Sequence, residues 1–207
     1  RLPALAAELV RLQVDIIVTG GAPAARVAKD ATVTIPIVMT QVGDPVGSGF
    51  VASLAQPGGN ITGLSSLAPE LSGKRLELLK EIVPRLSHVA VFGSSTDPDN
   101  AQTLKEVDLA ARALKVQLQI LDVLSSKDIA AAFGAATKRR ADAVLMLVTG
   151  VILNPQRSQI INLAVKNRLP VIYRTQGDVE AGGLMSYGVN NTDLARRAAT
   201  YVDKILK

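Results

Sequence analysis

Residues that could perform acid–base, nucleophilic or metal chemistry are scarce in this sequence. Histidine occurs once, at position 88, and cysteine does not occur. A Cys-His pair, a thiolate nucleophile and a cysteine metal site are therefore excluded, and a Ser-His-Asp arrangement could use only that one base. Because His88 directly precedes a strand-forming run, we interpret it as a partly exposed structural residue. We expect no catalytic residue, no metal, no cofactor and no enzymatic activity.

Two groups of acidic residues remain as candidates for chemistry. Asp97, Asp99 and Asn100 resemble a calcium loop, but the Asp-Gly spacing of such a loop is missing, so we interpret them as helix caps. Asp178 and Glu180 could pair for acid–base work. A hydrogen-bonding or capping role suits a loop position better.

The elements that must position these residues alternate between strands and helices. Short β-branched or extended runs predict strands at 15–19, 35–40, 61–65, 89–92, 116–121, 143–148, 170–173 and 184–187. Apolar residues at helical spacing and breaker residues predict helices at 2–12, 22–30, 44–54, 70–83, from about 100 to 114, 127–138, from about 156 to 168, and 192–206, with loops at 149–155 and 175–183. This alternation predicts an α/β protein with parallel sheets covered on both faces.

Ligands of open parallel sheets bind outside the carboxyl ends of the strands. The loops expected there are small, polar and glycine-containing, so their backbone N–H groups favour a carboxylate or phosphate. Tyr173, at a strand end, is a candidate for stacking on a ligand. The loops are 19–22, 40–44, 93–100, 149–154 and 174–180.

The composition carries neither a nucleic-acid nor a membrane signature. Hydrophobic residues make up 48% and aromatics only 3%, so the core must be aliphatic. The net charge is +5, but acids are mixed with the bases and no basic stripe with interleaved aromatics occurs, which argues against nucleic acid as a partner. No stretch approaches the ~20 apolar residues that span a bilayer, so we expect no direct membrane insertion.

Several segments, in chain order, resemble one group of ABC-transporter substrate-binding proteins, the group that contains tryptophan- and tyrosine-type binding proteins. The specific part is Asp44-Pro45-Val46-Gly47 followed by Ser53-Leu54-Ala55-Gln56-Pro57-Gly58-Gly59-Asn60-Ile61-Thr62-Gly63. The resemblance continues in 69–71, 73–80, 170–173 and 180–188, and so spans essentially the whole chain.

This resemblance implies a type I periplasmic-binding-protein fold: two doubly wound parallel-sheet lobes joined by a hinge and closing on a ligand. Residues 1–62 with 188–207 would form the first lobe, and 63–187 the second. The chain begins at Arg1 without Met and both ends lie in helical patterns, so we expect cuts in a longer protein whose precursor has a signal peptide. The first lobe would then lack a strand, and its open edge would be covered by further chain or by a partner chain, as in a dimer.

The resemblance also implies a periplasmic (extracytoplasmic) protein that passes a small molecule to an ABC transporter permease. The ligand-binding residues it implies are Gly21, Ala22, Thr40, Gln41, Ser94, Ser95, Asn100, Thr149, Gly150, Gln176, Asp178 and Glu180. Ala22 stands where a hydroxyl is common, and the segment 149–151 is more apolar than in amino-acid binders. An amino acid and an aromatic or hydrophobic acid therefore both stay open as ligands.

Two other classes of function stay open. The same fold serves as the ligand-sensing effector domain of a transcription regulator or receptor, for which an upstream helix-turn-helix or a fused transmembrane segment would decide. A doubly wound enzyme, such as a racemase, is the remaining alternative. The poverty of His and Cys and the lack of a glycine-rich fingerprint loop argue against it.

Overall fold

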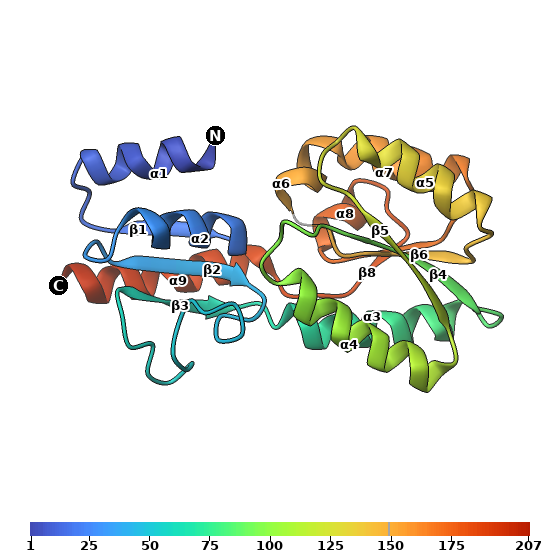
Figure 1. The fold of residues 1–207 in the computed structure, drawn as a ribbon, viewed down its shortest axis with the longest axis horizontal. Helices are drawn as coiled ribbons and strands as arrows, with labels where there is room; N and C mark the ends of the chain where they lie inside the picture. Colours follow the sequence, from blue (N-terminus) through green and yellow to red (C-terminus); the bar gives the residue numbers. More distant parts are fainter. Residues whose placement is uncertain (149) are drawn as a thin grey trace. The chain divides into compact units, whose positions relative to one another are not determined.

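The computed structural model describes residues 1–148 and 150–207, and the side chains of residues 150 and 151 lie outside the described part. The chain forms two compact units (Figure 1). Unit 1 comprises Arg1–Ala68 and Asn190–Lys207, and unit 2 comprises Pro69–Val189. All strand pairs in the described residues are parallel, which confirms the predicted α/β class with parallel sheets. Among the described residues, none of the helices combines the length and the hydrophobicity that a membrane span requires.

Unit 1 is built on a three-stranded sheet of order β1-β2-β3. Helix α2 packs on β1 and β2, α1 packs on α2, and α9 packs on β2 and β3. The buried residues of α2 are alanines, Ala22, Ala25 and Ala28, which let the helix lie close to Ile37 and Met39 of the sheet. The elements are α1 (Leu2–Arg11), β1 (Ile17–Gly20), α2 (Ala22–Ala31), β2 (Ile37–Val42), β3 (Ile61–Ser65) and α9 (Asn191–Leu206).

The prediction of a helix over 44–54 is wrong. Residues 45–49 form successive turns, in which Asp44 Oδ1 accepts a hydrogen bond from the N–H of Gly47 at 2.8 Å. Gly49 adopts φ +69°, and the N–H of Phe50 donates to the carbonyl of Pro45 at 2.8 Å. Two glycines within three residues remove the helix propensity that Asp44 and Pro45 suggest at the start of the segment.

Unit 2 is built on a five-stranded sheet of order β5-β4-β6-β7-β8. At the amino edge of this sheet, Asp142 joins the starts of β4 and β6. Its carboxylate accepts hydrogen bonds from the N–H and hydroxyl of Ser87 at 2.8 and 2.9 Å and from the N–H of His88 at 2.9 Å. The elements are α3 (Ala68–Ile82), β4 (His88–Gly93), α4 (Asn100–Leu114), β5 (Gln117–Asp122), α5 (Asp128–Lys138), β6 (Ala143–Met146), α6 (Gly150–Leu153), the short 3-10 turn η1 (Asn154–Gln156), α7 (Arg157–Lys166), β7 (Val171–Tyr173), α8 (Gln176–Glu180) and β8 (Met185–Ser186).

Alternate residues of the unit 2 strands enter two separate cores. Phe92 and Met146 face α5 and α7, whereas Val91 and Leu145 face α3 and α4 on the other side of the sheet (Figure 1). Phe92 meets Phe133 of α5 edge-on, with ring centroids 5.0 Å apart. Burial on both faces explains why these strands read as continuous apolar runs in the sequence.

Short helices occupy two segments that the sequence predicts to be loops. In 175–183, α8 runs from Gln176 to Glu180, and in 149–155, α6 runs from Gly150 to Leu153. Neither helix is long enough to show an apolar periodicity, so the sequence carries no signal for them. Both follow strands at the carboxyl edge of the unit 2 sheet.

Candidate ligand-binding site

Four predicted ligand contacts meet at the carboxyl edge of the unit 1 sheet. Gly21, with φ +82°, precedes α2, and its N–H donates to the carbonyl oxygen of Thr40 at the end of β2, at 2.8 Å. Thr40 is 5% exposed, and its hydroxyl donates to the carbonyl oxygen of Thr19 at 3.0 Å. Ala22 is buried. The hydroxyl of Thr40 is therefore already engaged within the sheet, and Ala22 offers only its backbone N–H.

Gln41 has the unusual backbone among these four. It adopts φ +60°, and the pairing register of β2 with β3 shifts between Met39 and Val42. A bulge re-aims a side chain, and a non-glycine residue in the left-handed region costs free energy, so such positions cluster at functional sites. Among these four residues, half-buried Gln41 is thus the one whose side chain the backbone geometry favours as a ligand contact.

In unit 2, three predicted contacts follow β4. The hydroxyls of Ser94 and Thr96 lie 2.9 Å apart, and Ser94 is buried. Ser95 donates its N–H and its hydroxyl to the carboxylate of Asp122, at 2.8 and 2.6 Å. Asn100 begins α4 and is half-buried. Asp122 therefore fixes the loop at Ser95, and it does so from the end of the neighbouring strand β5.

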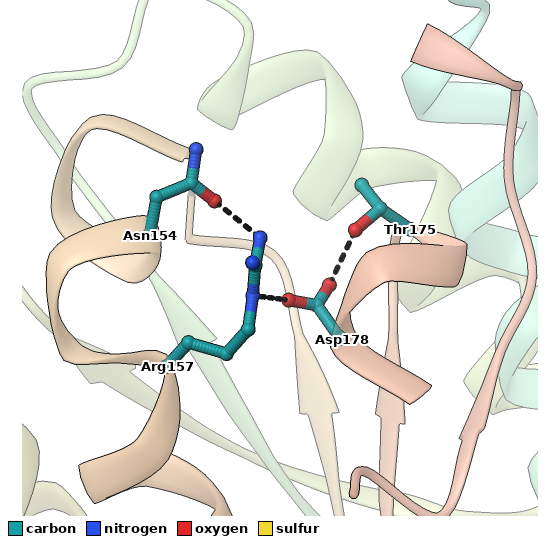
Figure 2. Close-up of polar contacts among 4 residues, drawn as sticks. All are labelled: Asn154, Arg157, Thr175 and Asp178. Atoms are coloured by element: carbon teal, nitrogen blue, oxygen red, sulfur yellow. Dashed lines mark hydrogen bonds and ion pairs between the residues drawn. The ribbon is translucent and has the colours of Figure 1, made fainter. Parts of the chain in front are cut away.

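The predicted contacts of α8 separate onto two faces of the helix. Asp178 is 1% exposed; its carboxylate accepts hydrogen bonds from Arg157 Nε at 2.9 Å and from the Thr175 hydroxyl at 2.7 Å. Arg157 also donates through Nη2 to Asn154 Oδ1 at 2.8 Å (Figure 2). Gln176 and Glu180 are exposed and bond to each other, from Nε2 to Oε1 at 2.8 Å. The carboxylate of Asp178 thus holds α8 to α7, and only the exposed pair faces solvent. Of the other two predicted contacts, Gly150 begins α6, and Thr149 lies outside the described residues.

The structure adds charged residues to this edge that the sequence analysis does not single out as ligand contacts. Arg174 follows β7, and its Nη1 donates to the carbonyl oxygen of Leu147, just after β6, at 3.0 Å. Burial lowers the pKa of Arg174, although the nearby carboxylates of Asp97, Asp99 and Asp178 act to raise it. Burial likewise raises the pKa of Asp97. Both residues stand in loops that are expected at the carboxyl ends of the parallel strands, and this position is the one sequence signal for them.

Arg75 is a buried guanidinium at the same side of unit 2. It is 2% exposed, donates from Nε to the carbonyl oxygen of Tyr187 at 2.5 Å and from Nη1 to the hydroxyl of Ser72 at 2.8 Å. Burial and, second, the charge of Arg174 lower its pKa to about 9. A Cβ on Gly188 would lie 2.1 Å from the carbonyl oxygen of Arg174 and 3.3 Å from Arg75 Nη2. Arg75 therefore ties α3 to the segment after β8, where only glycine fits.

Tyr173 does not offer a ring face to a ligand. It is 1% exposed and belongs to the core, and its hydroxyl finds no hydrogen-bond partner among the described residues. Burial raises its pKa to about 12. Tyr173 also borders a cavity of about 300 Å³, which is lined by residues of α7, the start of β7 and residues 182–184. None of these other lining residues is a predicted ligand contact. Nowhere in the described residues do three His, Cys, Asp or Glu side chains gather as a metal site would require.

The chain is similar to known proteins over nearly its whole length. Residues 2–207 match the model of a family described as ABC transporter substrate binding protein. The chain is similar to the tyrosine-binding protein of Clostridioides difficile (strain R20291), with 26% identity over 203 residues, which are 98% of this chain and 58% of that protein. The chain therefore spans less than two thirds of the length of this curated relative.

Two solved structures are similar over nearly the whole chain. A conserved domain protein from Vibrio cholerae O1 biovar El Tor has a TM-score of 0.88 and 31% identity, covering 99% of this chain and 69% of that one. The ABC domain in complex with L-Trp from Streptococcus pneumonia has a TM-score of 0.90 and 24% identity, covering 99% and 70%. At that identity the second likeness establishes the fold alone.

Proposed function

Because the chain belongs to the family of ABC transporter substrate-binding proteins, we propose that it binds a small organic solute outside the cytoplasm and passes it unchanged to an ABC transporter permease. The observation that carries this proposal is the match of the family model to residues 2–207. The resemblance noted in the sequence agrees with it. The proposal extends to a periplasmic location, a precursor with a signal peptide, and the two units as the two lobes of the fold.

The carboxyl edges of the two sheets support the proposal. In unit 1, Gly21 and Thr40 meet beside Gln41, whose backbone is held in the left-handed region. In unit 2, the loops after β4 and β7 carry Asp97 and Arg174. Polar groups at the carboxyl ends of parallel strands are where such sheets bind ligands, whereas the scarcity of His and Cys argues against catalysis.

We propose an amino acid or an aromatic or hydrophobic acid as the ligand. One relative is named for binding tyrosine, and one structure of similar fold contains L-Trp. A carboxylate suits the unit 1 edge, because the start of α2 offers backbone N–H groups there.

A thermal-shift screen of the purified protein tests the proposal. The panel holds the common amino acids, aromatic acids such as benzoate and 4-hydroxybenzoate, short fatty acids, dicarboxylic acids and nucleosides. A ligand at 100 times its Kd adds about 2.7 kcal/mol of stability, which is measurable. We expect one chemical class to stabilise the protein and mass spectrometry to recover the compound unchanged. Conversion of the compound would replace the proposal with an enzyme, and a flat panel would refute solute binding of these classes.

A further inference from the structure

Four loops of unit 2 run from the end of a helix to the start of a strand, and all four lie at the amino edge of the five-stranded sheet (Figure 1). They precede β4, β5, β6 and β7, which are neighbours in the sheet order β5-β4-β6-β7. The strand starts are level, since His88 lies opposite Gln117 and Val89 lies opposite Ala143. Because neighbouring strands are about 4.8 Å apart, the four loops line up over about 15 Å.

Each of these loops carries an exposed cation, and the last residues of α5 and α7 add two more. None of these side chains belongs to an ion pair within the described part of the chain. Two acids lie among them: Glu81 in the last turn of α3, and Asp142, whose carboxylate is already bound by Ser87 and His88. This amino edge, called the basic edge below, therefore has an excess of positive charge. Its cations are Arg85, Lys115, Lys138, Arg139, Arg140, Lys166 and Arg168.

Helix dipoles explain only part of this arrangement. A cation near the carboxyl end of a helix is favourable by itself, because it faces the negative end of the helix dipole. That effect accounts for one cation at each helix end, but residues 138–140 are three cations in succession. Like charges so close together repel one another, and an anionic partner relieves the repulsion. The carboxyl edge has the opposite character, with acids such as Asp97, Asp122 and Asp178.

An apolar feature lies beside the basic edge. The cavity of about 300 Å³ that Tyr173 borders is lined by Arg168 of this edge, and also by Val165 and Leu184. These two apolar side chains are 71% and 62% exposed. Exposed apolar groups beside a group of cations suit an anionic membrane, where cations meet the headgroups and apolar side chains reach the acyl boundary. Nucleic acid fits less well, because none of the four loops contains a Phe, Tyr or Trp on which a base could stack.

We propose that the basic edge of unit 2, together with the cavity beside Arg168, is a docking surface for a membrane that contains anionic phospholipids. The cations bind the phosphate groups of the lipids, and Val165 and Leu184 enter the apolar boundary beneath them. This inference goes beyond the proposed function, because it concerns the surface on which the protein rests and not the solute it carries. Lying on the membrane also keeps the protein near any permease embedded there.

Cosedimentation of the whole chain with lipid vesicles tests the proposal. The probes are vesicles of phosphatidylcholine alone and vesicles with about one third phosphatidylglycerol, whose surface potential is negative. The first variant combines Lys115→Gln and Lys138→Gln, at the carboxyl ends of α4 and α5. Its matched control combines Lys105→Gln in the first half of α4 with Lys127→Gln just before α5. All four lysines are exposed, so both variants lose the same charge from the same two helices but at opposite ends.

A second pair of variants tests the apolar part of the surface. Leu184→Ser removes an exposed side chain that lines the cavity. Leu124→Ser is its control, because Leu124 is 50% exposed and follows β5 at the carboxyl edge. Far-UV circular dichroism checks that every variant is folded.

We expect the wild type to bind the anionic vesicles but not the neutral ones, and to be released as salt is raised to about 0.5 M. One Lys or Arg near an anionic surface contributes about fivefold in affinity, so the variant with Lys115→Gln and Lys138→Gln should bind about 25-fold more weakly. The variant with Lys105→Gln and Lys127→Gln should stay within about threefold of the wild type, because its changes lie beyond the reach of the surface potential. Leu184→Ser should weaken binding more than Leu124→Ser does.

Four results would overturn the proposal in whole or in part. Absence of binding to the anionic vesicles would refute it, and an equal loss in the two lysine variants would show that net charge and not the basic edge is responsible. Tighter binding to soluble poly-L-glutamate than to the vesicles would replace the membrane by an acidic protein as the partner. Equal binding by Leu184→Ser and Leu124→Ser would remove the cavity from the docking surface. Each result leaves solute binding to be decided separately by the thermal-shift screen.

Discussion

The buried ion pair between Arg157 and Asp178 should control the stability of unit 2. Substituting Arg157→Met keeps most of the apolar stem and removes the charge that faces the carboxylate. Asp178 has a 1% exposed side chain, whereas that of Arg157 is 31% exposed. The variant therefore leaves an anion that water reaches poorly, with the Thr175 hydroxyl at 2.7 Å as its remaining partner (Figure 2).

The expected magnitude follows from this asymmetry. Removing one partner of a fully buried pair costs about 3–5 kcal/mol. Because Arg157 is partly exposed, water can enter where its guanidinium stood, so we expect about 2 kcal/mol for Arg157→Met. Asp178→Asn leaves only a cation that water can reach, so it should cost about 1 kcal/mol. The double variant should cost about 1 kcal/mol less than the sum of the two single variants, because the second change removes the unpaired charge.

Urea unfolding followed by tyrosine fluorescence measures these effects. The chain has no Trp and three Tyr, of which Tyr173 and Tyr187 lie in unit 2. Arg112→Met is the matched control, because it breaks a pair with Asp108 at 2.7 Å in which both side chains are exposed, and exposed pairs contribute less than about 1 kcal/mol. An Arg157→Met variant as stable as Arg112→Met, or a coupling energy near zero, would refute the reasoning.

Three further predictions concern the same unit. Gly188→Ala should destabilise the protein by about 1–3 kcal/mol in urea unfolding, because the new Cβ would lie 2.1 Å from the Arg174 carbonyl oxygen. Gly134→Ala, in α5 with nothing within 4 Å of the new Cβ, should instead stabilise it by up to about 1 kcal/mol; equal effects would contradict this account. Tyr173→Phe should change the free energy of unfolding by less than about 1 kcal/mol at neutral pH, since the hydroxyl it removes has no partner among the described residues, and a larger loss would reveal a missing hydrogen bond. Burial raises the pKa of Asp142, but the three hydrogen bonds that its carboxylate accepts outweigh burial and leave the pKa lowered. The stability of the wild type over Asp142→Asn should therefore be full above about pH 4 and be lost as the pH falls through the folded pKa; a difference that stays constant from pH 7 to pH 3 would contradict it.

Much of the fold could be predicted because its signals are local. The unit 2 strands are buried on both faces, so each appears in the sequence as an unbroken apolar run, such as 89–92 and 143–148. Long helices such as α3 and α4 show their apolar spacing over several turns. The helix predicted at 44–54 failed because capping residues signal where a helix starts but not whether one propagates past two glycines.

The candidate site could be predicted only as a set of loops. The expectation that ligands bind outside the carboxyl ends of parallel strands correctly places the loops 93–100 and 174–180 at the carboxyl edge of unit 2, since it needs only the order and direction of the strands. It does not say which side chains within a loop are engaged. Asp178 and Glu180, two residues apart in the sequence, end as a buried ion-pair member and an exposed residue because α8 forms between Gln176 and Glu180.

The sequence by itself determines the α/β class, the parallel strands, the scarcity of catalytic groups and the family. These properties depend on composition, periodicity and short motifs, each of which is complete within a few neighbouring residues. Only the tertiary structure decides that Arg174 reaches the end of β6, that Arg157 pairs with the buried Asp178, and that Arg75 binds the carbonyl of Tyr187, 112 residues further along the chain. The physical reason is that charge pairing, burial and close approach depend on distances in space, which are set by the order of the strands in the sheet rather than by their order in the chain.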